Sequence, residues 1–146
     1  MKTLVFVACI LAAVSADNIL RHIKTSEMFD IIKLLDFQKT LEECALKLDS
    51  LDIVTPETLY CVAQKKNLIN KDNGLKLHKG VNYSNTIVRN GNLRDKMTGM
   101  KDQCKEKIAG DKFKGSQYEK TMKFMECFLP IVNYILRKLG PFKNNI

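Results

Sequence analysis

Cysteine is the residue type whose number and spacing indicate chemistry most clearly in this sequence. Beyond residue 16 there are four of them, Cys44, Cys61, Cys104 and Cys127. An even number of cysteines in an exported chain indicates disulfides, because thiols oxidise outside the cell. Four cysteines allow three pairings. We favour Cys44–Cys61 with Cys104–Cys127, because each bond closes a short loop between neighbouring predicted helices.

No other pattern of residues predicts a catalytic or metal centre. Zinc is the competing interpretation of the cysteines, but there is no C-x-x-C pair, and His22 and His78 are not spaced as ligands. Glu42 and Glu43 are adjacent and point to different helix faces, and no G-x-S-x-G, phosphate-binding glycine loop or H-E-x-x-H occurs. We therefore expect no enzyme, no metal and no cofactor. The histidines are expected at the surface; the alternative is that one of them titrates to release a ligand at acid pH.

The N-terminus has the pattern of a secretory signal peptide over residues 1–16. Lys2 is followed by the apolar run Leu4–Val14, and small residues close the segment. The run is shorter than the roughly 20 residues that a membrane span requires. We expect cleavage before Asp17 and a secreted, extracellular domain over 17–146, which is enough chain for one core.

The net charge of +8 is the main compositional argument about partners. The lysines are spread along the chain without a basic arm, so we expect a solvated basic surface and no nucleic acid. The alternative is a basic secreted protein, of the salivary or venom type, that acts on anionic membranes or polyanions.

Apolar residues repeat at helical spacing through most of the chain, and no segment alternates as a strand does. The sequence therefore predicts an all-α fold, a compact bundle of about six helices around an internal hydrophobic cavity. The apolar stripes are Met28, Ile31, Ile32 and Leu35; Leu41, Cys44, Ala45 and Leu48; Leu59, Val62 and Ala63; and Leu93, Met97, Met100, Cys104 and Ile108.

Local signals mark several boundaries. Ser26 is a plausible N-cap of the first predicted helix, and Thr55-Pro56 has the cap and first-turn proline of a helix that ends near Asn67. The segment Asp72-Asn73-Gly74 predicts a turn, followed by a short helix and loop. Asn82 begins an N-x-S sequon and is a candidate glycosylation site.

Residues 116–139 form the most apolar segment, with one stripe through Tyr118, Met122, Met125 and Leu129 and a second through Phe124, Phe128, Ile131 and Ile135. A helix that is apolar on two sides is buried among others or lines a cavity. Pro130 predicts a kink or break, which would let the segment with Val132, Ile135, Leu136 and Leu139 fold back as one wall or lid of the cavity. The alternative places the same apolar face in a dimer contact or on a membrane.

Methionine and aromatic side chains are concentrated in the second half of the chain and suit an adaptable apolar pocket. An ordinary core is the alternative for any one of them, and Tyr118 or Tyr134 could offer a hydroxyl to a polar head group. The candidate ligand-binding residues are Met97, Met100, Phe113, Tyr118, Met122, Phe124, Met125, Phe128, Val132 and Ile135.

The cysteine pattern resembles that of the insect odorant-binding protein family, which has six cysteines. The segment Val62–Gly74 resembles the one that follows the third cysteine in that family. Glu57 stands three intervening residues before Cys61, at the second cysteine position, and Tyr118 stands eight before Cys127, at the fifth. The two missing cysteines are bonded to each other in the family, so the chain resembles the four-cysteine "minus-C" subgroup.

That resemblance implies first-to-third and fourth-to-sixth disulfides, the pairing already favoured. It also implies a secreted carrier or scavenger that binds an odorant, pheromone or lipid-like molecule reversibly. Salivary scavengers and ant venom allergens share the scaffold, so the olfactory role stays open. The expected partner is a small hydrophobic ligand; a membrane receptor or a second copy of the chain is a further candidate.

Overall fold

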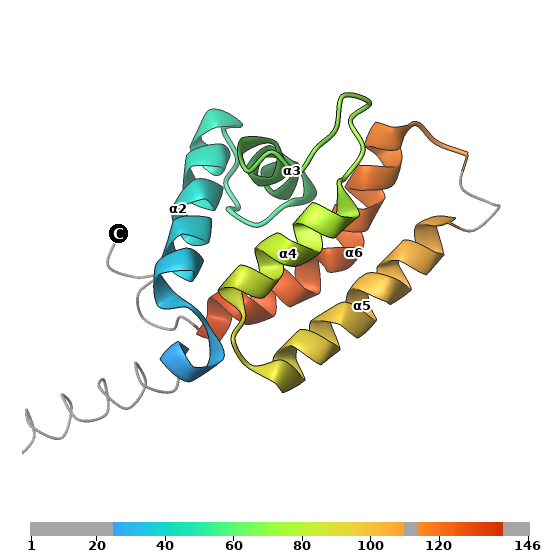
Figure 1. Ribbon diagram of the computed structural model, residues 1–146. Helices are drawn as coiled ribbons and strands as arrows, with labels where there is room; N and C mark the ends of the chain where they lie inside the picture. The colour runs from blue at the N-terminus through green and yellow to red at the C-terminus, as the bar shows by residue number, and fades with distance from the viewer. Residues whose placement is uncertain (1–24, 110–113, 139–146) are drawn as a thin grey trace, which may run out of the picture.

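The computed structural model describes residues 25–109 and 114–138, and in them the all-α prediction is confirmed (Figure 1). A helical turn at residues 25–28 precedes five helices: α2 (Ile31–Lys47), α3 (Pro56–Lys65), α4 (Leu77–Ile87), α5 (Gly91–Ala109) and α6 (Gln117–Lys138). β-structure within these ranges is limited to two isolated bridges. The predicted signal peptide, His22, Phe113 and Leu139 lie outside the described residues.

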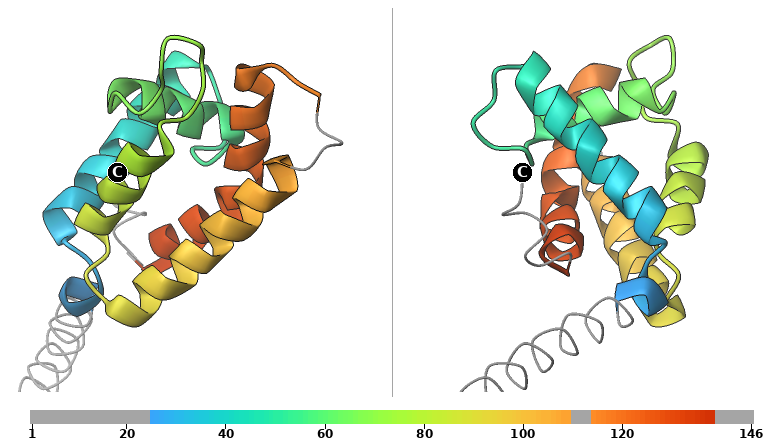
Figure 2. Two further views of the ribbon diagram at one scale, coloured as in Figure 1. Left: turned by 45° about the vertical axis from the view of Figure 1, so that its right-hand side comes forward. Right: turned by 90° about the vertical axis from the view of Figure 1, so that its left-hand side faces the viewer.

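Helix α6 is the central element, as the sequence predicts. Both α3 and α5 pack against it, and α2 packs on α3. Figure 1 shows α4 crossing in front of α6, and the turned views of Figure 2 show α5 running beside α6. The buried core extends through all five helices.

Two disulfides join neighbouring helices in the predicted pairing. Cys44–Cys61 connects α2 to α3 with Cα atoms 5.9 Å apart, and Cys104–Cys127 connects α5 to α6 with Cα atoms 5.7 Å apart. By the entropy of loop closure each contributes about 3 kcal/mol. Since all four cysteines are oxidised, none is a thiolate ligand, and the zinc interpretation is wrong.

The start of the first long helix is not where the sequence predicts it. The Asp30 side chain caps α2 by accepting from the Lys33 backbone N–H, so Ser26 is not its N-cap. The chain breaks between the two helical segments because Phe29 is fully buried and forms an antiparallel bridge with Val88. This bridge ties the start of α2 to the end of α4.

The buried face of α2 also differs from the predicted stripe. Ile32 is 80% exposed and Leu35 is 42% exposed, whereas Leu34 and Leu41 are fully buried. The break at Asp30 restarts the helix, which rotates the inward face away from the stripe of residues 28–35. Of the next predicted stripe, Leu41, Cys44 and Ala45 are buried as predicted, whereas Leu48 at the end of the helix is 46% exposed.

The helix predicted at Thr55-Pro56 is confirmed in detail. Thr55 and Thr58 form a reciprocal capping box at the start of α3, with Pro56 in its first turn. The helix ends at Lys65, and Asn67 adopts a positive φ of 58°. The predicted turn follows, with Asn73 at a φ of 64°.

Helix α6 continues through Pro130 to Lys138, so the predicted fold-back of the C-terminal segment is wrong. A helix can pass a proline by bending, and the left view of Figure 2 shows a bend in α6. The apolar face of Val132, Ile135 and Leu136 is nevertheless buried, as an extension of the core.

Helix α4 has fewer stabilising features than the other described helices. It has no side-chain N-cap, and Ile87 is its one fully buried residue. Its middle contains Gly80, which lowers helix propensity by about 0.8–1 kcal/mol relative to alanine. These features make α4 the helix most easily displaced.

Replacing Gly80 with alanine is therefore expected to raise the free energy of unfolding by about 0.5–1 kcal/mol. A Cβ added there meets no atom within 4 Å, so the gain in propensity is not offset by a clash. Chemical denaturation measures this change in the free energy of unfolding.

Gly74→Ala is the control variant, which should not be stabilised in the same way. An added Cβ there would lie 3.1 Å from Asn70 Nδ2 and 3.2 Å from Gln117 Oε1. A Gly80→Ala protein less stable than the parent would show that α4 is not formed as described.

Candidate ligand-binding site

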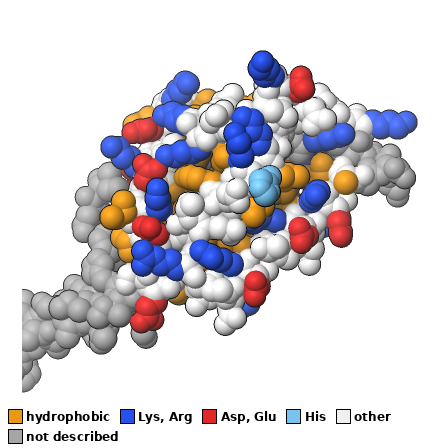
Figure 3. Space-filling view, in the orientation of Figure 1, with side chains coloured by type: hydrophobic (Ala, Val, Ile, Leu, Met, Phe, Trp, Pro, Cys, Tyr) orange, Lys and Arg blue, Asp and Glu red, His pale blue; other side chains and the backbone are white. Residues whose placement is uncertain are grey.

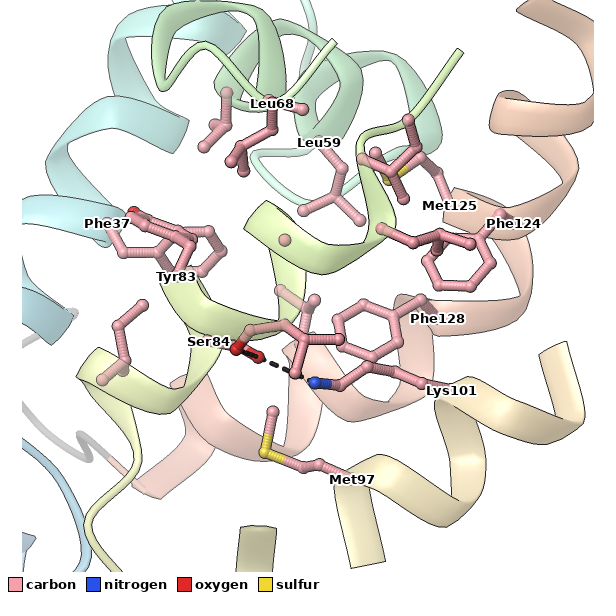
Figure 4. Close-up of a pocket in the computed structure, with 18 of the residues that line it drawn as sticks. Phe37, Leu59, Leu68, Tyr83, Ser84, Met97, Lys101, Phe124, Met125 and Phe128 are labelled. Carbon is pink, nitrogen blue, oxygen red and sulfur yellow. Dashed lines mark hydrogen bonds between the residues drawn. The ribbon is translucent and has the colours of Figure 1, made fainter. Parts of the chain in front are cut away.

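An apolar pocket lies between α4 and the inner faces of α3, α5 and α6, and Phe37 of α2 also lines it (Figure 4). Its volume is about 120 Å³. From α3 and the loop after it come Leu59, Val62 and Leu68, and α4 contributes Leu77 and Val81. In the space-filling view, hydrophobic side chains are visible along both sides of α4 (Figure 3). Helix α4 therefore covers the pocket without sealing it.

The structure brings most of the predicted ligand-binding residues together in this pocket. Six side chains from α5 and α6 line it: Met97, Phe124, Met125, Phe128, Val132 and Ile135. The rings of Phe124 and Phe128 are stacked with centroids 5.9 Å apart. The C-terminal segment thus supplies part of the pocket wall, although it does so as a continuation of α6.

Of the other four predicted residues, Phe113 lies outside the described residues, and Met100, Tyr118 and Met122 do not line the pocket. Met100 is 39% exposed on α5, and Met122 is half-buried on a different side of α6. Tyr118 is 44% exposed and packs edge-on against the Tyr60 ring. Tyr134 is equally exposed, with Lys138 Nζ 5.0 Å from its ring centroid, so neither tyrosine offers its hydroxyl to this pocket.

None of the ligand-binding residues predicted from the sequence lies on α4, although α4 forms part of the pocket wall. Leu77, Val81 and Val88 do fall at i, i+4 and i+11 of a helical repeat, but Gly80 and Ser84 interrupt the apolar pattern. Those two small residues nevertheless line the pocket. A search for helical spacing that allowed small residues on the inward face would have found this wall.

Three polar side chains line the pocket: Tyr83, Ser84 and Lys101. Lys101 Nζ donates to Ser84 Oγ over 2.8 Å, which links α5 to α4. Burial lowers the pKa of the Lys101 ammonium, and the nearby charge of Asp102 opposes that shift. Burial, with a smaller contribution from the Asp36 charge, raises the pKa of Tyr83 to about 12. The Tyr83 hydroxyl is buried and has no hydrogen-bond partner among the described residues.

The glycosylation candidate lies on the same helix. Asn82 is exposed on α4, whereas the next two residues of its sequon, Tyr83 and Ser84, line the pocket. A glycan on Asn82 would therefore point away from the pocket. Occupancy of the site stays a prediction.

The chemistry of the pocket lining in the described residues suits binding rather than catalysis. Among them no three His, Cys, Asp or Glu side chains come together where they could hold a metal ion. None of the described helices is long and apolar enough to cross a bilayer. The lining is almost wholly hydrocarbon, thioether and aromatic, which suits a ligand bound by apolar burial.

Comparison of the chain with protein-family models, curated proteins and solved structures finds no match. The class that the described residues define is an all-α domain with two disulfides and an apolar pocket. Assignment to the odorant-binding family rests on the cysteine spacing and the segment after Cys61 alone.

Proposed function

We propose that the protein is a secreted carrier or scavenger that binds a small hydrophobic molecule reversibly in the pocket under α4. The observation that carries this proposal is the convergence of five helices on one apolar pocket. Two of them, α5 and α6, are joined by the Cys104–Cys127 disulfide. In this arrangement α5 and α6 form a fixed wall, and α4 can move to admit and release a ligand.

The size of the pocket indicates how it would work. Its 120 Å³ is close to the roughly 150 Å³ of an engineered apolar cavity that binds benzene. A ligand longer than a single ring therefore needs more room than the pocket has. Displacement of α4, which has one fully buried residue, is the simplest source of that room. In this proposal α4 closes over the ligand and completes an internal cavity.

The proposed compartment and family follow from independent features. The predicted leader and the two disulfides agree with an extracellular protein. The four-cysteine pattern supports membership of the minus-C odorant-binding proteins. A membrane receptor and a second copy of the chain remain the expected protein partners.

The rival function, action on anionic membranes or polyanions, is less well supported. It needs the apolar face of the C-terminal helix to be free for insertion, but Val132, Ile135 and Leu136 are each no more than 6% exposed. The basic charge alone remains in its favour.

A calorimetric titration with octan-1-ol at two salt concentrations tests the proposal. We expect saturable one-to-one binding, with an affinity that changes by less than about twofold between low and high salt, because burial of a neutral chain is not screened. Anionic lipid vesicles provide the comparison. No binding of octan-1-ol, together with vesicle binding that weakens steeply with salt, would overturn the carrier proposal in favour of the rival.

A further inference from the structure

Lys101 is the one charged residue among the described residues that line the pocket. Its side chain leaves α5 and reaches across the pocket wall to α4, where Nζ lies 2.8 Å from Ser84 Oγ. Figure 4 shows the ammonium between Ser84, Met97 and Phe128, facing the space that these residues enclose. A cation is therefore built into a wall that is otherwise almost entirely apolar.

This half-buried ammonium has one protein acceptor among the described residues. An ammonium has three N–H donors, and Ser84 Oγ is the one acceptor described for it. No carboxylate in the described ranges forms an ion pair with Lys101. Since a half-buried charge without a counter-charge is unfavourable, an anion entering the pocket would relieve a deficit that is already present.

Ser84 can adapt to such an anion. Its hydroxyl accepts from Lys101 and donates to the Val81 carbonyl over 2.9 Å. A carboxylate beside Lys101 could accept from Nζ through one oxygen and from the reoriented Ser84 hydroxyl through the other. The two donors come from different helices, so the same head group would also hold α4 closed.

We propose that the pocket selects amphiphiles with a carboxylate head group, and that Lys101 and Ser84 receive this head group while the apolar body lies against the α6 side of the pocket. This inference rests on the proposed function and adds the chemical class of the ligand. The expected ligand is a monocarboxylic acid with a short to medium hydrocarbon body. Burial lowers the pKa of the Lys101 ammonium, and the Asp102 charge opposes that shift; an anionic head group beside Nζ would oppose it further.

The alternative role for Lys101 is a latch that only holds α4 through Ser84. A latch would influence every ligand equally, whereas a receptor for the head group would distinguish acids from alcohols. Octanoate and octan-1-ol share one hydrocarbon body and differ in the head group, so they separate the two roles.

The test measures both affinities by calorimetry at neutral pH for the parent protein and for Lys101→Met. A charge-assisted hydrogen bond accounts for about tenfold or more in affinity. We expect Lys101→Met to weaken octanoate binding about tenfold more than it weakens octan-1-ol binding. Lys105→Met, an exposed lysine on the same helix, should change neither affinity. Lys101→Arg should retain most of the preference, and thermal unfolding confirms that each variant is folded.

The outcomes are distinct. Equal weakening of both ligands by Lys101→Met, or no effect on either, would overturn the head-group role while leaving the pocket function intact. If the parent protein binds neither ligand, the proposed function fails and this inference fails with it. Should Lys101→Met not fold, Lys101→Gln, which keeps a polar tip, replaces it with the same expected results.

Discussion

Replacing Met97 with tryptophan is expected to weaken octan-1-ol binding by at least about thirtyfold. Met97 is 4% exposed and lines the pocket from α5. The larger indole would occupy space that the ligand needs, and each methylene that can no longer be buried costs about 0.8 kcal/mol. Exclusion of three methylenes therefore corresponds to about 2.4 kcal/mol, or about fiftyfold in affinity. Calorimetric titration of the variant gives the result directly.

Met100→Trp is the matched control for this prediction. Met100 lies on the same helix, is 39% exposed and does not line the pocket, so the Met100→Trp protein should bind octan-1-ol as the parent does. Overpacking at Met97 is expected to lower stability by about 1–3 kcal/mol, and circular dichroism verifies the fold. Ala63→Met fills the same pocket from α3 and serves if Met97→Trp unfolds. Unchanged affinity in a folded Met97→Trp or Ala63→Met protein would place the ligand elsewhere.

Leu34→Ala is expected to lower the free energy of unfolding by about 2–5 kcal/mol, the range for a large-to-small substitution in a packed core. Leu34 is fully buried on α2, whereas Ile32, two residues earlier, is 80% exposed. Ile32→Ala should therefore change stability by no more than about 0.5 kcal/mol. Urea denaturation of both variants measures the difference.

This pair distinguishes the observed face of α2 from the stripe that the sequence suggests, which includes Ile32 and omits Leu34. A larger effect at Ile32 than at Leu34 would show that the helix is rotated from the orientation described. Equal and small effects would show that α2 does not pack against the core at this end.

What the sequence predicted correctly was determined by local chemistry. The Thr55 side chain caps α3 by accepting from the Thr58 backbone N–H, within one turn of the helix, so this helix start needs no tertiary information. The disulfide pairing follows from loop length and helix order, both of which are properties of the chain itself. The burial of Phe124, Ile131 and Ile135 follows from their helical spacing.

What could not be predicted depends on contacts between distant segments. The face that α2 buries was misjudged because Phe29 pairs with Val88, far along the chain, and that bridge sets where α2 begins. On α6, both Met122 and Met125 belong to the same apolar stripe, yet only Met125 reaches the pocket. The difference depends on where α4 lies.

The polar part of the site was missed for a related reason. Lys101 looks like one more surface lysine of a basic protein, since the polar residues Asp102 and Gln103 follow it directly in the sequence. Its role is apparent only once α4 brings Ser84 to within 2.8 Å of its Nζ. A lysine whose aliphatic stem lies along an apolar wall has no distinct sequence pattern.

The most direct measurement of the central claim is methyl NMR of the protein carrying ¹³C-labelled methionine, titrated with octan-1-ol. Four methionines report on two sides of the same two helices: Met97 and Met125 line the pocket, and Met100 and Met122 do not. If the pocket under α4 binds the ligand, the Met97 and Met125 methyl resonances shift together and saturate, while those of Met100 and Met122 stay in place. The account would be contradicted by no saturable shift at any of the four, or by the largest shifts at Met100 and Met122.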